Sequence, residues 1–200
     1  MAPLTVYIIR HAEKPIGKKG ETDAILGVDP DGNHDSHNLI VQGWQRAGGL
    51  AELFAHQPGN TPLRAGIAQP DAIYATAFIL SADTGDSDTD GGEDSKSRRP
   101  QSTVTPLYQK LGVALNTTYS EGEEPALAAD VMARSGTVLI CWHHGHIPNL
   151  ATDIGGSGLG IPTTWPSQRF DMIWVLGRDA SGAWAFSQLP QYLLPGDKPI

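Results

Sequence analysis

Apolar runs separated by polar stretches set the expected framework of this chain. Residues 6–9 are apolar and rich in β-branched side chains, which predicts a strand buried on both faces, as in parallel sheets covered by helices. Further strands are expected at residues 71–76, 113–118, 137–142, 170–176 and 183–188, the last two as a closing hairpin. Apolar residues at helical spacing predict helices over about residues 39–56, 99–112, 125–134 and 146–154. This alternation predicts an α/β fold with a mostly parallel sheet flanked by helices.

Composition and charge narrow the class of protein. The length of 200 residues suits one domain with a substantial core, so residues 1–200 are expected to fold as a unit. The formal net charge of −8 argues against nucleic acid and anionic membranes as partners, because both require a basic face. No apolar run approaches about eighteen residues and no leader pattern precedes the first strand, so a cytoplasmic protein is expected. The composition indicates no oligomeric state. The single cysteine, Cys141, lies in an apolar run, which predicts a buried thiol rather than a nucleophile.

Residues 81–97 depart from the globular pattern. They hold five aspartates, one glutamate and no aromatic residue, which is the composition of a solvated insertion. Within them, Asp86, Asp88 and Asp90 precede a glycine in the spacing that opens a calcium-binding loop, where alternate carboxylates bind one cation. Ser97 stands where such a loop has its closing glutamate. A calcium site at the three aspartates and a solvated acidic loop are therefore both open, and no other cofactor is expected.

Arg10 and His11 directly follow the first expected strand. Open α/β sheets bind ligands in the crevice at the carboxyl ends of their strands. Arginine supplies a permanent cation for an oxyanion, and the neighbouring imidazole can attack phosphorus or transfer a proton. The junction therefore predicts phosphate chemistry.

Four segments resemble motifs of the histidine phosphatase superfamily. Residues 10–13, Arg-His-Ala-Glu, resemble its Arg-His-Gly-Glu signature, with alanine in place of glycine. Residues 39–47 resemble its Leu-Thr-x-x-Gly-x-x-Gln-Ala helix, residues 99–104 its Arg-Ala-x-Gln-Thr-Ala segment, and residues 138–145 its second-histidine strand. The resemblance covers roughly residues 4–155 and implies the phosphoglycerate-mutase-like fold, a three-layer α/β sandwich. It also implies a phosphatase that hydrolyses a small phosphomonoester, or a protein phosphohistidine, through a phosphohistidine intermediate.

The resemblance implies roles for individual residues at this site. His11 would attack phosphorus through one ring nitrogen, while Glu13 or a backbone carbonyl holds the other nitrogen. Arg10 and Arg99 would bind the phosphoryl oxygens. Arg98 would be an ordinary surface neighbour of Arg99.

Two assignments require a choice between nearby residues. His144 is expected as the second phosphate-binding histidine, because it precedes a glycine as in the family and because strand alternation would point His143 the other way. Glu124 is expected as the proton donor for the leaving group, with Glu121 as the alternative. The Arg-His-Tyr-Gly stretch of the glycolytic mutases is absent, so hydrolysis is expected rather than mutase activity.

Two other functions are compatible with the sequence. One is a metal-binding protein or metallohydrolase that uses clustered side chains, namely His34, Asp35, His37, His143, His144 and His146. The arginines at positions 10 and 99 argue against it, because they would repel a cation. The other is a catalytically inactive, phosphate-binding member of the same fold.

Overall fold

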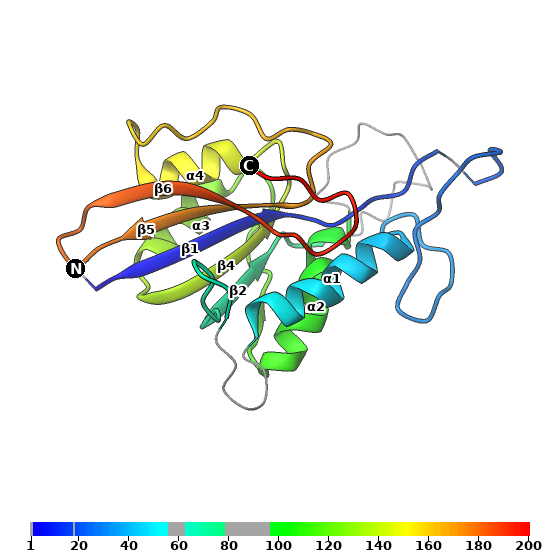
Figure 1. Cartoon of the computed structure of the whole chain (residues 1–200), viewed down its shortest axis with the longest axis horizontal. Coiled ribbons are helices and arrows are strands. Elements are labelled where there is room, and N and C mark those ends of the chain that lie inside the picture. The colour runs from blue at the N-terminus through cyan, green and yellow to red at the C-terminus, as the bar shows by residue number, and fades with distance from the viewer. Residues whose placement is uncertain (1, 18, 56–62, 79–96) are drawn as a thin grey trace.

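The structure is a computed structural model of the 200-residue chain, and it describes residues 2–17, 19–55, 63–78 and 97–200 (Figure 1). The calcium ligands expected at Asp86, Asp88 and Asp90 lie outside these residues.

One sheet of six strands forms the centre of the described chain, in the order β3-β2-β4-β1-β5-β6. Its parallel strands are β1 (Leu4–Arg10), β2 (Ala72–Ala75), β3 (Leu115–Asn116) and β4 (Gly136–Trp142). The expected hairpin is confirmed, since β5 (Met172–Arg178) and β6 (Trp184–Pro190) are antiparallel and β5 pairs antiparallel with β1. The sheet is therefore mostly parallel, as predicted. The strand expected at residues 113–118 is shorter than predicted.

Helices cover both faces of this sheet. They are α1 (Val41–Phe54), α2 (Arg99–Leu111), α3 (Glu124–Met132) and α4 (Ile147–Gly155). In Figure 1, α1 and α2 lie side by side on one side of the sheet, and α3 and α4 lie on the other. The three-layer α/β sandwich is therefore confirmed.

Alternation along the central strands divides the core between the two faces. In β1, Val6 and Ile8 belong to the cluster that includes α3 and α4, whereas Tyr7 and Ile9 belong to the cluster that includes α1 and α2. Cys141 of β4 is fully buried in the second cluster, and burial raises the pKa of its thiol. The prediction of a buried thiol is confirmed.

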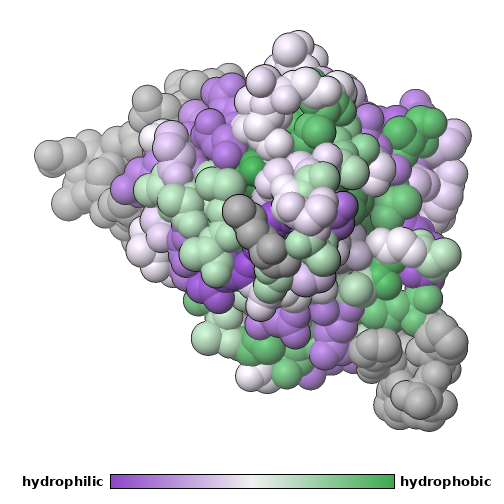
Figure 2. All heavy atoms as spheres, turned by 90° about the vertical axis from the view of Figure 1, so that its left-hand side faces the viewer, coloured by the Kyte–Doolittle hydropathy of each residue, from purple (hydrophilic) through white to green (hydrophobic). Residues whose placement is uncertain are grey.

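The surface at the N-terminal end of the sheet is mixed in character. Figure 2 shows hydrophilic and hydrophobic residues interspersed on this face. None of the helices in the described part of the chain has the length and apolar character needed to cross a membrane.

Candidate active site

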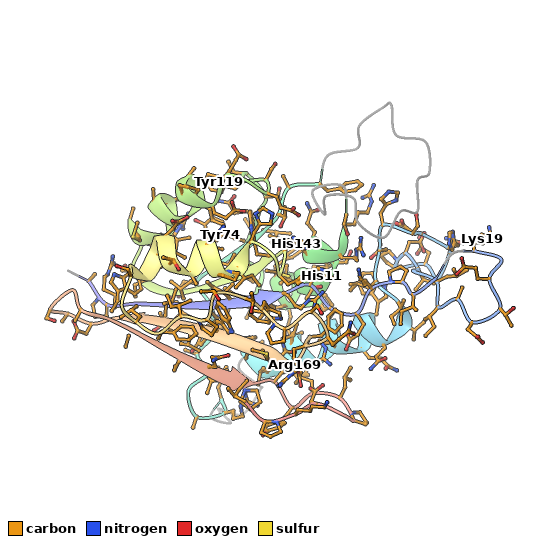
Figure 3. The ribbon with its side chains drawn as sticks, turned by 90° about the horizontal axis from the view of Figure 1, so that it is seen from above. His11, Lys19, Tyr74, Tyr119, His143 and Arg169 are labelled. Atoms are coloured by element: carbon orange, nitrogen blue, oxygen red, sulfur yellow. The ribbon has the colours of Figure 1, made fainter. Side chains whose placement is uncertain are left out.

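The pairing of β1 with β4 brings two histidines together. Arg10 lies opposite Trp142 in this parallel pair, so the next residues along the two strands, His11 and His143, come side by side. Their rings are stacked, with an interplanar angle of 4° and centroids 6.5 Å apart. Figure 3 shows both side chains at the same end of the sheet.

The expectation that His143 points away from His11 is wrong. Residues opposite each other in a parallel pair point to the same face of the sheet, so the register that pairs Arg10 with Trp142 also puts His143 on the face of His11. β4 ends at Trp142, and in the turn that follows the backbone N–H of His146 donates to the carbonyl of His143 at 3.0 Å. His144 instead lies edge-on against the His143 ring, with centroids 4.5 Å apart and an interplanar angle of 79°.

The His11 ring is held in one tautomer. Its Nδ1 lies 2.7 Å from the backbone carbonyl oxygen of Ala12. A carbonyl oxygen can only accept, so Nδ1 carries a proton, and in the neutral imidazole Nε2 then carries the lone pair. Of the two partners expected for this nitrogen, Glu13 and a backbone carbonyl, the structure has the carbonyl.

Arg10 is buried beneath the segment that precedes β5. Its side chain is about 1% exposed, and one terminal N–H donates to the carbonyl of Ser167 at 2.5 Å. Its guanidinium carbon lies 3.9 Å from the centre of the Phe170 ring, and that ring lies 6.0 Å from the His11 ring. Phe170 therefore contacts both residues of the Arg-His junction. The sequence carries no motif that could have identified it.

Glu13 has a structural partner rather than a catalytic one. Its carboxylate accepts from Arg46 of α1 at 2.7 Å, and Arg46 also donates to Asp197 at 2.8 Å and to Gln191 at 2.9 Å. This network ties the segment after His11 to α1 and to the C-terminal tail. Both tail residues were missed in the sequence, because no local pattern indicates that a proline-rich tail folds back.

Gly43 allows α1 to approach the same segment. A Cβ atom at this position would lie 2.6 Å from the carbonyl oxygen of Glu13, which is closer than any side chain tolerates. The loss of helix propensity at Gly43 is thus the cost of a close contact. This contact places α1 against the residues that follow His11.

The start of α2 lies against the same segment. The Thr103 hydroxyl accepts from the backbone N–H of Ala12 at 2.8 Å and donates to the carbonyl of Arg99 at 2.7 Å. The Arg99 guanidinium donates from Nε to the Ser97 hydroxyl at 2.5 Å. Arg98 points elsewhere, with its guanidinium carbon 4.3 Å from the centre of the Phe78 ring. Arg99 therefore stands one helical turn before the residue that contacts Ala12.

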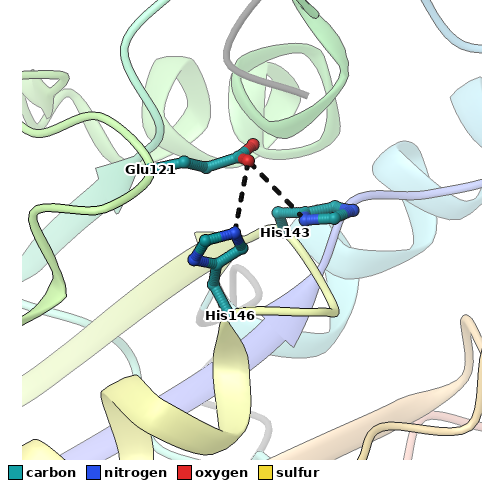
Figure 4. Close-up of side chains that lie close together, drawn as sticks. All are labelled: Glu121, His143 and His146. Atoms are coloured by element: carbon teal, nitrogen blue, oxygen red, sulfur yellow. Dashed lines mark ion pairs between the residues drawn. The ribbon is translucent and has the colours of Figure 1, made fainter. Parts of the chain in front are cut away.

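The two candidate acids have different environments. The Glu124 carboxylate is 5% exposed as a residue and accepts from the indole N–H of Trp142 at 2.9 Å and from the backbone N–H of Gly122 at 3.1 Å. Glu121 lies beside the second histidine, with Oε2 at 3.7 Å from Nδ1 of His143 and 3.6 Å from Nε2 of His146 (Figure 4). Glu124 thus has structural hydrogen bonds as well as a contact with His146, and Glu121 is the acid that lies beside His143.

The histidines that the sequence offered as metal ligands lie in two separate parts of the structure. His37 lies 3.7 Å from Asp35 on the loop before α1, and the His37 carbonyl accepts from Arg98 at 2.9 Å. Among the described residues, the one group whose ligand atoms converge consists of Glu121, His143 and His146. The six-residue metal cluster considered from the sequence does not assemble.

Comparisons with known proteins support the fold. No protein-family model and no curated protein sequence matches this chain. Among solved structures, the protein histidine phosphatase SixA complexed with tungstate matches with a TM-score of 0.53 and 15% identity, over 94% of this chain and 97% of that one. The phosphoglycerate mutase of Plasmodium falciparum matches with a TM-score of 0.51 and 11% identity, over 100% of this chain and 99% of that one. This chain has the phosphoglycerate-mutase-like fold. The likeness extends along nearly the whole of each chain, so the phosphoglycerate-mutase-like fold accounts for all four helices and six strands described above.

Proposed function

We propose that this protein is a histidine-dependent phosphatase that hydrolyses a phosphomonoester or a protein phosphohistidine through a phosphohistidine on His11. The observation that carries the proposal is the His11 ring, whose Nδ1 is held by the Ala12 carbonyl and which is stacked beside His143, so that the neutral ring would have its lone pair on Nε2. A nucleophilic imidazole requires this tautomer. The fold neighbour SixA is itself a protein histidine phosphatase, which supports the same reaction class here.

The reaction proceeds in two displacements. Nε2 of His11 attacks phosphorus, an N–P bond forms, and the ester P–O bond breaks with its electron pair leaving on the substrate oxygen. Water then attacks phosphorus, the N–P bond breaks, and inorganic phosphate is released. Each step needs cations that are already in place for the equatorial oxygens.

Arg10, Arg99 and His143 supply these cations in our proposal. Arg10 is buried beside His11, and Arg99 begins the helix whose Thr103 contacts Ala12. We assign the role of the second histidine to His143 in place of His144, because the His143 ring is the one stacked on His11. A local positive pocket of this kind offsets the net charge of −8 for an anionic substrate.

Trapping the intermediate tests this function. We expect a radiolabelled phosphomonoester, quenched within one turnover, to leave label on the wild-type chain that survives alkali and is lost in acid, as an N–P bond requires. His11→Gln should carry no label while keeping the wild-type circular dichroism spectrum. Full activity without label, together with loss of activity on chelation, would instead indicate a metal-activated water and overturn the proposal.

Glu121 is the proposed proton donor to the leaving oxygen, and its role predicts a dependence on substrate. Glu121→Gln should lower kcat/KM for an alkyl phosphate by roughly 10²–10⁴-fold, the usual contribution of a general acid. It should affect p-nitrophenyl phosphate far less, because p-nitrophenolate leaves without a proton. The quantity to measure is the ratio of the two kcat/KM values.

Glu124→Gln is the matched control for this prediction. It makes the same change three residues away, at a carboxylate that accepts from Trp142 and Gly122. We expect a lower melting temperature and an unchanged ratio between the two substrates. A ratio that changes in Glu124→Gln and not in Glu121→Gln would assign the proton donor to Glu124.

A further inference from the structure

Three side chains from two different segments converge near the end of β4, and His143 is one of them. Glu121 comes from the turn before α3, while His143 and His146 come from the turn between β4 and α4 (Figure 4). Their ligand atoms, one carboxylate oxygen and two imidazole nitrogens, all lie within 4.8 Å of one another. Two imidazoles and one carboxylate form a donor set that binds zinc in many enzymes.

The spacing of these atoms is close to that of a metal site. Zinc lies about 2.0–2.2 Å from nitrogen and oxygen ligands in a tetrahedral site, which places neighbouring ligand atoms roughly 3.3 Å apart. The carboxylate oxygen of Glu121 lies 3.7 Å from Nδ1 of His143 and 3.6 Å from Nε2 of His146. Small side-chain rotations would bring all three atoms to bonding distance.

A second carboxylate orients one of the imidazoles. Nδ1 of His146 lies 3.0 Å from Oε1 of Glu124, whose own position is fixed by hydrogen bonds from Trp142 and Gly122. In a metal-bound state, His146 would donate Nδ1–H to this carboxylate and offer Nε2 to the ion beside Glu121. Carboxylate–histidine–metal arrangements of this kind fix the tautomer of metal-binding histidines and raise their basicity.

We propose that Glu121, His143 and His146 form a zinc-binding site and that zinc bound there blocks the phosphatase reaction. Nitrogen donors select zinc and similar transition metals over magnesium and calcium. A Glu121 carboxylate bound to zinc cannot give its proton to a leaving group, and a zinc-bound His143 is held away from the phosphoryl oxygens. The blocking rests on the proposed function, whereas zinc binding does not.

Calorimetric titration of the full chain with zinc chloride, after chelation and dialysis, tests the binding. We expect one zinc ion per chain in the wild type, and an affinity at least tenfold weaker in His146→Ala. His37→Ala is the matched control, since His37 also lies near a carboxylate, and it should bind zinc like the wild type. Equal zinc affinities in wild type and His146→Ala, with both chains folded by circular dichroism, would overturn the site.

Three further measurements separate the parts of the proposal. Cobalt in place of zinc should give the strong visible absorption of a tetrahedral site. The Glu124→Gln substitution should weaken zinc binding by about 10–100-fold if Glu124 orients His146. Zinc should reduce the hydrolysis of an alkyl phosphate, whose leaving group needs the Glu121 proton, over the same concentration range in which it binds. Tight binding without inhibition would overturn the block but keep the site. A chain that hydrolyses neither a phosphomonoester nor a protein phosphohistidine would refute the function while the titration still decides the site.

Discussion

His11→Ala is expected to lower kcat by about 10⁴-fold or more, because removing a nucleophile leaves only the binding contribution to catalysis. The loss should be nearly the same for alkyl and aryl phosphates, since both must pass through the N–P intermediate. The His11 side chain is about 1% exposed and bonded to the Ala12 carbonyl, so the fold of the variant has to be checked. Steady-state kinetics together with near-ultraviolet circular dichroism make that check.

His34→Ala serves as the control for this substitution. It removes the same side chain from an exposed position in the loop before α1, and kcat should stay within a factor of about two of wild type, as for most surface changes. Comparable losses in both variants would mean that the effect does not come from the nucleophile. A folded His11→Ala chain with substantial turnover would refute the mechanism.

Arg46→Ala is expected to lower the free energy of unfolding by about 3–5 kcal/mol, because it leaves two buried carboxylates without their cation. The side chains of Glu13 and Asp197 are 11% and 5% exposed, and both accept from Arg46. Denaturation by urea at pH 7, followed by circular dichroism, measures the change. Lys110→Ala breaks an ion pair with Glu52, which is 62% exposed, and should cost no more than about 1 kcal/mol.

The loss in Arg46→Ala should depend on pH in a defined direction. Burial alone would raise the pKa of Asp197, but its hydrogen bonds from Arg46 and from backbone N–H groups lower the pKa below its ordinary value of 3.8. A lowered pKa in the folded state means that the contribution to stability is complete above pH 3.8 and is lost as the pH falls through the folded pKa. The difference in stability between wild type and Arg46→Ala should therefore narrow in acid. A difference that stays constant from pH 7 to pH 3 would exclude Asp197 as the source.

The layered fold could be predicted from local patterns. The apolar run at residues 6–9 and the one at residues 137–142 are long enough to identify the two central strands, and each alternates between the two helical layers as expected. Gly43 was also informative, because a glycine inside an amphipathic helix predicts the close backbone contact that the structure has. These features depend on neighbours in sequence.

The exact pairing of side chains at the site could not be predicted in the same way. His143 and His144 are adjacent, and alternation alone says only that their side chains point to opposite faces of the sheet. Which of the two shares a face with His11 depends on how β4 is aligned with β1. The pairing of Arg10 with Trp142 decides which of the two histidines lies beside His11, and one sequence alone does not give the register of two strands.

Contacts between distant segments were missed for a related reason. Phe170 reaches Arg10 from the segment before β5, and Asp197 reaches Arg46 from the C-terminal tail. Neither residue belongs to a motif, and each acts only because the sheet brings distant segments together. Residues of this kind support the site without leaving a signal in the sequence.

The register between β1 and β4 also governs which changes of length this protein can accept. One residue added inside either strand would shift His11 or His143 by one position relative to the neighbouring strand and turn its side chain to the opposite face of the sheet. Residues added to a connection between elements leave the alignment of β1 with β4 unchanged. The acidic stretch at residues 81–97 lies in such a connection, between β2 and α2. Changes of length in the connection between β2 and α2 are therefore compatible with the His11–His143 pairing, whereas the two strands that carry these histidines keep a fixed length.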